Sequence, residues 1–385
     1  MHRRHFLAAS GLAALTPALA NAASPSSSTG NATLLKRVTF QTDGLGLAPR
    51  EYAALLAEAT VAREIKPDYY SNEGFIAELE QQFARLLGKE AAMFIATGTL
   101  ANLLAVRKLA GSERRVLVQA ESHFYNDSGD GAVTLAGLNL VPLAAGRGTL
   151  ELAEVKAWVE RSASGRVPLK VGAISIENPV RRRDHEMVDF DELRRVCAYA
   201  REQGIRLHLD GARMFNLPLH SGKSIKEHAA LFDTVYVSLW KHFNGASGAM
   251  LAGDAAFIEG LYETRRMFGG SLPQAWPLVG LVPGFVETYE ADYAKSWRAA
   301  DELIERLAHD ERFEVRRVPN GTSRFLLSLS GVDANAFAER AKSRDVLVPK
   351  AMPGTSTMQM QVNPSILRMP VEQIAEAVLG AARTS

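Results

Sequence analysis

Three apolar segments of the sequence end in polar residues whose types could take part in catalysis. VGAISIEN ends in Glu177 and Asn178, IRLHLDGAR carries Asp210 and Arg213, and TVYVSLWKHF carries Ser238 and Lys241. In open α/β sheets, ligands bind beyond the carboxyl ends of the strands, so these residues are expected at one rim of a sheet. Such a rim would place an acid beside a lysine amine. A lysine amine can form a Schiff base with an aldehyde cofactor or a carbonyl substrate.

Pyridoxal-phosphate (PLP) chemistry needs four groups, and this sequence offers a candidate for each. Lys241 is the candidate for the Schiff-base amine, and Asp210 for the acidic partner of the pyridine nitrogen. Gly98 and Thr99 in ATGTLANLL lie at a turn that opens a predicted helix, where free backbone N–H groups favour a phosphate. His123 in ESHFYND could lie against the pyridine face. Each residue alone suits an ordinary structural role, so the prediction depends on all four occurring in order along one rim.

Alternating strands and helices must position these residues. The apolar patterns predict strands at 91–96, 115–120, 171–177, 205–210 and 234–240, and helices at 74–88, 99–110, 190–203 and 223–231. Apolar strands separated by helices predict an α/β fold with a mostly parallel sheet covered on both faces. A long helix at 282–308 followed by three further strands, at 313–318, 323–330 and 346–350, predicts a smaller α+β domain. We therefore expect a PLP-binding large domain over 35–280 and a small carboxyl-terminal domain over 281–385.

Composition and charge restrict the kind of partner. The 385 residues are 47% apolar, which suits a globular protein with a large core. Lys and Arg number 44 against 43 Asp and Glu, so the charge gives no electrostatic case for binding nucleic acid or an anionic membrane. A small-molecule partner is expected. Cys197 is the one cysteine, which excludes an intramolecular disulfide and a cysteine-based metal cage, and no metal site is expected.

The amino terminus has the features of an export signal. Residues 1–23 combine a basic start, an apolar stretch and Ala-x-Ala endings, and Arg3 and Arg4 followed by His5, Phe6 and Leu7 resemble a twin-arginine signal. The Ser-rich residues 24–34 predict a linker. We therefore expect export to the periplasm, with a Sec signal or an uncleaved anchor as alternatives. No later segment approaches the roughly 20 apolar residues of a membrane helix, so no membrane association of the mature protein is expected.

Four motifs resemble the L-threonine aldolases of the β-eliminating lyase group, which are fold-type I PLP enzymes. These motifs are HLDGARMFN, VSLWKHFNGASGAMLAG, ATGTLANLLAV and ESHFYND, and the similarity runs from TFQTD at 39–43 to Gln274. The resemblance implies a large PLP domain, a small carboxyl-terminal domain and cleavage of a β-hydroxy-α-amino acid to glycine and an aldehyde. It also implies a homodimer or homotetramer whose active sites borrow residues from a neighbouring subunit.

The resemblance also implies roles for individual residues. Lys241, Asp210, His123, Gly98 and Thr99 match the cofactor residues of the family, and Ser238 is expected beside them. Arg213 resembles the arginine that binds the substrate carboxylate, a role that suits a bidentate guanidinium. Thr42 falls where the family has a serine near that carboxylate, and Tyr70 in DYYSNEG aligns with a family tyrosine expected at the substrate.

Two departures concern substrate and phosphate binding. The family often has an ENTH-like run whose histidine handles the substrate hydroxyl, whereas this chain reads IENPV with Pro179 and Val180. Pro273 in FGGSLPQ stands where members of the family commonly have an arginine that contacts the phosphate. The second carboxylate contact has only Arg368 as a candidate.

Further departures flank the lysine, where Trp240 and His242 replace a more usual serine and glycine. Together these changes leave the cofactor residues largely intact while altering the handling of the substrate. Three other PLP reactions therefore stay open, namely β-elimination, racemisation and transamination. A catalytically reduced ligand-binding homologue is also open.

Overall fold

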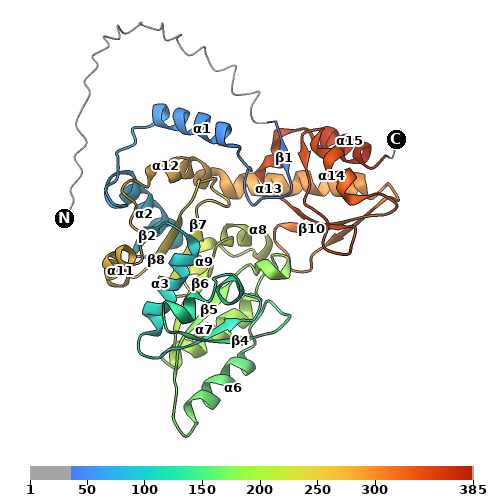
Figure 1. Ribbon diagram of the computed structural model, residues 1–385. Helices are drawn as coiled ribbons and strands as arrows, with labels where there is room; N and C mark the ends of the chain where they lie inside the picture. The colour runs from blue at the N-terminus through green and yellow to red at the C-terminus, as the bar shows by residue number, and fades with distance from the viewer. Residues whose placement is uncertain (1–35, 384–385) are drawn as a thin grey trace, which may run out of the picture. The chain divides into compact units, whose positions relative to one another are not determined.

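The computed structural model describes residues 36–383, and the largest sheet formed by these residues has seven strands (Figure 1). The strand order is β2-β8-β7-β6-β5-β3-β4. The bounds are β2 (Ala91–Ile95), β3 (Arg115–Gln119), β4 (Asn139–Leu143), β5 (Val171–Glu177), β6 (Arg206–Asp210), β7 (Thr234–Ser238) and β8 (Ala249–Gly253). Strand β8 runs opposite to the other six strands of this sheet, so its pairs with β2 and β7 are antiparallel and the remaining pairs are parallel. The predicted α/β fold with a mostly parallel sheet is confirmed, whereas the predicted signal and linker lie outside the described residues.

Helices with one apolar side cover the sheet. Helix α3 (Gly98–Ala110) begins after Thr97, whose hydroxyl accepts a hydrogen bond from the backbone N of Leu100, and it packs against β5, β6, β7 and β8. Helix α7 (Phe190–Glu202) is capped by Asp189 in the same way and buries its apolar side, including Cys197. The remaining α-helices between Gly74 and Val279 are α2 (Gly74–Leu87), α4 (His123–Asn126), α5 (Gly131–Thr134), α6 (Leu152–Ala163), α8 (Leu217–Ser221), α9 (Ile225–Ala229), α10 (Ala255–Glu259), α11 (Tyr262–Met267) and α12 (Trp276–Val279).

The carboxyl-terminal region has its own antiparallel sheet, as the α+β prediction requires. This sheet has the order β12-β10-β9, formed by β9 (Phe313–Arg317), β10 (Arg324–Leu329) and β12 (Thr357–Gln361). The long helix α13 (Val282–Leu307) leads into it, and α13 packs against α15 (Val371–Ala381), which in turn contacts α14 (Ala334–Lys342). No helix among residues 36–383 is long and apolar enough to cross a membrane.

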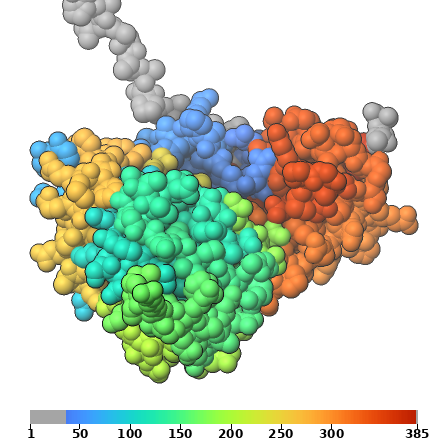
Figure 2. Space-filling model, turned by 60° about the horizontal axis from the view of Figure 1, so that its bottom comes forward, coloured from blue at the N-terminus to red at the C-terminus, as the bar shows by residue number. Residues whose placement is uncertain are grey.

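The amino-terminal segment of the described chain is bound to the carboxyl-terminal region. Strand β1 (Val38–Thr39) pairs in parallel with β11 (Val346–Leu347), so the predicted strand at 346–350 is shorter than expected and joins a separate two-stranded sheet. The side-chain amide of Asn363 donates to the carbonyl oxygens of Thr39 (2.7 Å) and Thr42 (2.9 Å). Figure 2 shows the blue surface around α1 (Pro49–Ala62) against the red surface of the carboxyl-terminal region. These contacts hold residues 38–43 beside the ends of the large sheet.

Candidate active site

A cavity of about 430 Å³ brings six of the predicted site residues together, namely Gly98, Thr99, His123, Asp210, Arg213 and Lys241. They come from the ends of four strands. Gly98 and Thr99 open α3 after β2, His123 opens α4 after β3, Asp210 ends β6, and Lys241 follows β7. Because these strands run in one direction, their carboxyl ends meet at one edge of the sheet, as expected for a ligand site in an α/β fold.

Lys241 lies at the junction of this cavity with a second one. The second cavity, of about 470 Å³, is lined by Thr42 and Asp43 among others and shares Trp240 and Lys241 with the first. The Lys241 amine lies 5.0 Å from the centre of the Trp240 ring and has no hydrogen-bond partner among residues 36–383. Burial, aided by the charge of Arg213, lowers the pKa of Lys241 to about 8. An appreciable fraction of this amine is therefore unprotonated and nucleophilic near neutral pH.

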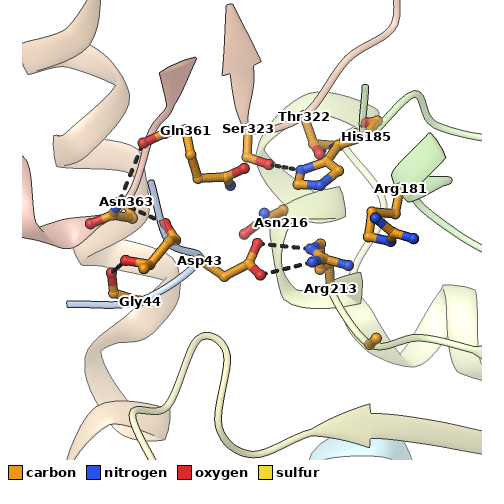
Figure 3. A network of polar contacts seen from close by, with 12 residues as sticks. Asp43, Gly44, Arg181, His185, Arg213, Asn216, Thr322, Ser323, Gln361 and Asn363 are labelled. Atoms are coloured by element: carbon orange, nitrogen blue, oxygen red, sulfur yellow. Dashed lines mark hydrogen bonds and ion pairs between the residues drawn. The ribbon is translucent and has the colours of Figure 1, made fainter. Parts of the chain in front are cut away.

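Arg213 is held by a carboxylate that the sequence analysis did not single out. Its Nε and Nη2 donate to the two carboxylate oxygens of Asp43 at 2.7 and 2.8 Å, and both side chains are buried (Figure 3). Burial alone would raise the pKa of Asp43, but the charge and hydrogen bonds of Arg213 hold it well below its usual range. Asp43 occupies one edge of the guanidinium. Nη1 and the second hydrogen of Nη2 have no partner in the described part of the chain, so the edge that they form is available to a carboxylate.

Asp210 is held firmly at the end of β6. Its Oδ2 accepts a hydrogen bond from Nδ2 of Asn102 (2.7 Å), and its Oδ1 accepts one from the backbone N of Ala212 (3.2 Å). Glu177 is the register partner of Asp210 on β5. Burial and the neighbouring Asp210 raise the pKa of Glu177 to about 7. Asp210 therefore presents a carboxylate that is fixed by two donors.

His123 and the turn before α3 complete the cavity. The backbone N of His123 donates to Glu177 at 2.6 Å, which fixes the start of α4. Burial lowers the pKa of His123, so its ring is neutral, and Nδ1 has no partner among the described residues. A Cβ atom on Gly98 would lie 1.9 Å from the Tyr236 hydroxyl, so only glycine allows this close approach. A nucleophilic lysine, a fixed carboxylate, an aromatic ring and a helix amino terminus together fit PLP.

Two predicted residues line neither cavity. Ser238 is fully buried at the end of β7. Tyr70 lies beyond the cavity walls, where its carbonyl oxygen accepts a hydrogen bond from Arg265 and its ring packs 5.3 Å from the Arg266 guanidinium. Their cofactor and substrate roles stay predictions. Arg368 donates to backbone carbonyl oxygens, including that of Leu45 (3.2 Å), and lines a different cavity, so it is not placed for a second carboxylate contact beside Lys241.

The wall near the missing histidine is formed by charged residues. Val180 is completely buried and lines neither cavity. The next residue, Arg181, lines the 430 Å³ cavity and forms an ion pair with Asp127, which also pairs with Arg182 at 2.9 Å. Both side chains of the first pair are partly exposed, so this pair could rearrange around a substrate.

Sequence reasoning missed Asp43 and Asn102, for which the sequence offers only a position close to a predicted site residue. Asp43 directly follows Thr42 in TFQTD, and Asn102 lies one helical turn after Gly98, on the same face of α3.

The beta-eliminating lyase family model matches residues 52–328. The chain belongs to the beta-eliminating lyase family. The predicted L-threonine aldolase relationship is confirmed by curated relatives and by solved structures. Enzymes of this kind are PLP-dependent lyases that act on small amino acids, so the prediction of a PLP-dependent lyase is confirmed at that level.

Among the relatives of this beta-eliminating lyase is the low-specificity L-threonine aldolase of Eremothecium gossypii, 28% identical over 89% of this chain and 87% of that protein. Another is alanine racemase TOXG of Cochliobolus carbonum, 29% identical over 57% of this chain and 56% of that protein. A crystal structure of a proposed L-allo-threonine aldolase from Listeria monocytogenes EGD-E superimposes with a TM-score of 0.74. It is 27% identical and covers 91% of this chain and 97% of that chain. These relatives carry different activity names, so similarity alone does not fix the reaction.

Proposed function

We propose that this beta-eliminating lyase binds PLP covalently at Lys241 and cleaves a β-hydroxy-α-amino acid to glycine and an aldehyde. The observation that carries the proposal is the single cavity in which Lys241, Asp210 and Arg213 meet. When bound, PLP supplies an electron sink for breaking a bond at the amino-acid Cα. The substrate class follows from an amine-binding lysine beside an arginine that can take a carboxylate.

Residues of this chain bind the cofactor and the substrate and accept the proton that leaves the substrate. Asp210 offers its negative charge to the pyridine nitrogen, and the backbone N–H groups of Gly98 and Thr99 bind the phosphate. Arg213 binds the substrate carboxylate through its open Nη1 and Nη2 edge. The neutral His123 ring packs against the cofactor and accepts the proton of the substrate hydroxyl.

The second candidate reaction at the same site is racemisation or another reaction that exchanges the proton on Cα. Two observations favour it. Val180 is buried in the segment where the family often has a histidine that handles the substrate hydroxyl, and a racemase is among the relatives. In that reaction Lys241, whose pKa is about 8, would move the Cα proton without breaking the Cα–Cβ bond.

The experiment is a product assay on the PLP-loaded full chain. L-threonine and L-allo-threonine are supplied, and glycine with an equal amount of acetaldehyde is expected. Lys241→Ala should abolish turnover and the visible absorbance of the lysine-bound cofactor, whereas Lys295→Ala, at an exposed lysine, should change neither. L-alanine is supplied in a parallel reaction, and its conversion to D-alanine, with no aldehyde formed from threonine, would favour racemisation. Wild-type protein that does not take up PLP would refute the proposed function.

We also propose export through the twin-arginine route and assembly into a homodimer or homotetramer. The pair Arg3–Arg4 ahead of an apolar stretch supports the export route. Replacing both with Lys should retain the protein in the cytoplasm on cell fractionation, and continued export would refute the route. Light scattering on the mature protein tests the assembly, and a monomer at micromolar concentration would refute it.

A further inference from the structure

A buried chain of side-chain hydrogen bonds ends on Asp210. The Thr234 hydroxyl lies 2.8 Å from Nδ1 of His208, and Nε2 of His208 lies 2.8 Å from Oδ1 of Asn102. Nδ2 of Asn102 then lies 2.7 Å from Oδ2 of Asp210. Thr234, His208 and Asn102 are all 0% exposed, so water does not compete for these bonds.

The chemistry of the groups fixes the direction of every hydrogen. An ionised carboxylate only accepts, so Asn102 turns its NH₂ towards Asp210 and its carbonyl towards His208. That carbonyl accepts, so Nε2 of His208 must carry a hydrogen. Burial lowers the pKa of His208 to about 4, so the ring is neutral and its Nδ1 accepts the Thr234 hydroxyl hydrogen. Each donor therefore points towards Asp210.

We propose that Thr234, His208 and Asn102 are positioning residues that hold Asp210 negatively charged and correctly oriented for the cofactor nitrogen. Donors aligned in series polarise one another, and hydrogen bonds to a charged acceptor are stronger than those between neutral groups. The chain also joins three elements, because Thr234 is on β7, His208 on β6 and Asn102 on α3. Since α3 begins at Gly98, the same bonds fix the phosphate turn relative to Asp210. This role rests on the proposed PLP site.

The donor order can be measured without the cofactor. Nitrogen NMR of histidine side chains in the cofactor-free full chain should show His208 as the neutral tautomer with hydrogen on Nε2, at pH 6 to 8, well above its pKa of about 4. Thr234→Val keeps the shape of the side chain and removes the hydroxyl that donates to Nδ1 of His208, so it should change the NMR signals of His208. An imidazolium, or a wild-type tautomer with hydrogen on Nδ1, would overturn the proposed order.

The effect on Asp210 is measured by PLP affinity and by the pH dependence of the bound cofactor's absorbance. Asn102→Leu removes a hydrogen bond to a charged group, so PLP affinity should fall roughly 10- to 100-fold. His208→Gln can still donate to Asn102 and should bind PLP more tightly than His208→Leu. If Asn102 only packed, Asn102→Leu would lower stability and leave the pH midpoint of the cofactor's absorbance unchanged. A shifted midpoint in Asn102→Leu therefore indicates a positioning role.

Thr322→Val is the matched control, because Thr322 is also fully buried and its hydroxyl donates to a backbone carbonyl outside the cofactor cavity. It should leave PLP affinity and the absorbance titration unchanged. Equal effects of Thr322→Val and Thr234→Val, or an unchanged titration in Asn102→Leu, would overturn the inference. Wild-type protein that does not bind PLP would refute the proposed site itself. In that case the measured tautomer of His208 would still test the proposed order of donors, because it needs no cofactor.

Discussion

The buried pair of Asp43 and Arg213 makes Asp43→Asn an informative substitution. The side chains are only 11% and 9% exposed, and two hydrogen bonds join them. Removing one partner of a buried ion pair typically costs about 3–5 kcal/mol. Asn retains one acceptor, and the open edge of Arg213 borders a cavity that water can enter, so we expect a loss of about 2–3 kcal/mol in the free energy of unfolding.

Urea denaturation of the cofactor-free protein at pH 7 measures this loss. The control is Asp301→Asn, which breaks the exposed pair of Asp301 and Arg317 and should cost less than about 1 kcal/mol. The folded-state pKa of Asp43 lies below its unfolded value, so its contribution is complete above about pH 4 and is lost as the pH falls further. The difference between wild type and Asp43→Asn should therefore shrink in acid. An Asp43→Asn loss no larger than that of Asp301→Asn would refute the reasoning.

Three further predictions concern the cofactor cavity. Gly98→Ala should weaken PLP binding about tenfold or more in a fluorescence titration, because the added Cβ would clash with Tyr236. The control Gly131→Ala, whose Cβ would have no contact closer than 4.0 Å, should not weaken it. The rate of PLP attachment to the cofactor-free protein should rise with pH through a midpoint near 8, the pKa of Lys241, and a flat profile would contradict this. His123→Phe keeps an aromatic ring but loses the proton acceptor, so cleavage should fall roughly 10²–10⁴-fold with PLP affinity nearly unchanged, and equal losses of both would contradict it.

Much of the fold could be predicted from the sequence because several of its parallel strands are buried and read as largely apolar runs. Strands β5 and β7 are fully buried, β6 is buried except at Arg206, and all three lie within the predicted ranges for this reason. Edge strand β4, with an exposed Asn139, has a weaker pattern and was not predicted. Strand β11 is short because only two of the predicted residues find a partner, in β1. Pairing partners that lie far apart in the sequence leave no local pattern.

The candidate site follows the same division. Residues that close apolar strands or open helices, such as Asp210 and Gly98, could be predicted because the strand ends define where they lie. Asp43 could not be predicted in this way, because its partner Arg213 lies 170 positions away in the sequence. Residues 38–43 are held near Arg213 through contacts with the carboxyl-terminal region. Asn102 was hidden within an ordinary helical pattern. Its role depends on the neighbouring strand that carries His208.

The two unusual neighbours of Lys241 have different consequences. His242 is buried and stacks on Tyr289, with ring centres 4.6 Å apart and planes 13° apart, and it lines neither cavity that contains Lys241. This departure is accommodated by packing. Trp240 is 52% exposed and lines both of those cavities, so it is the change that can alter which substrate reaches the lysine. We therefore expect substrate preference to depend on Trp240, on the side of Lys241 that Thr42 also lines.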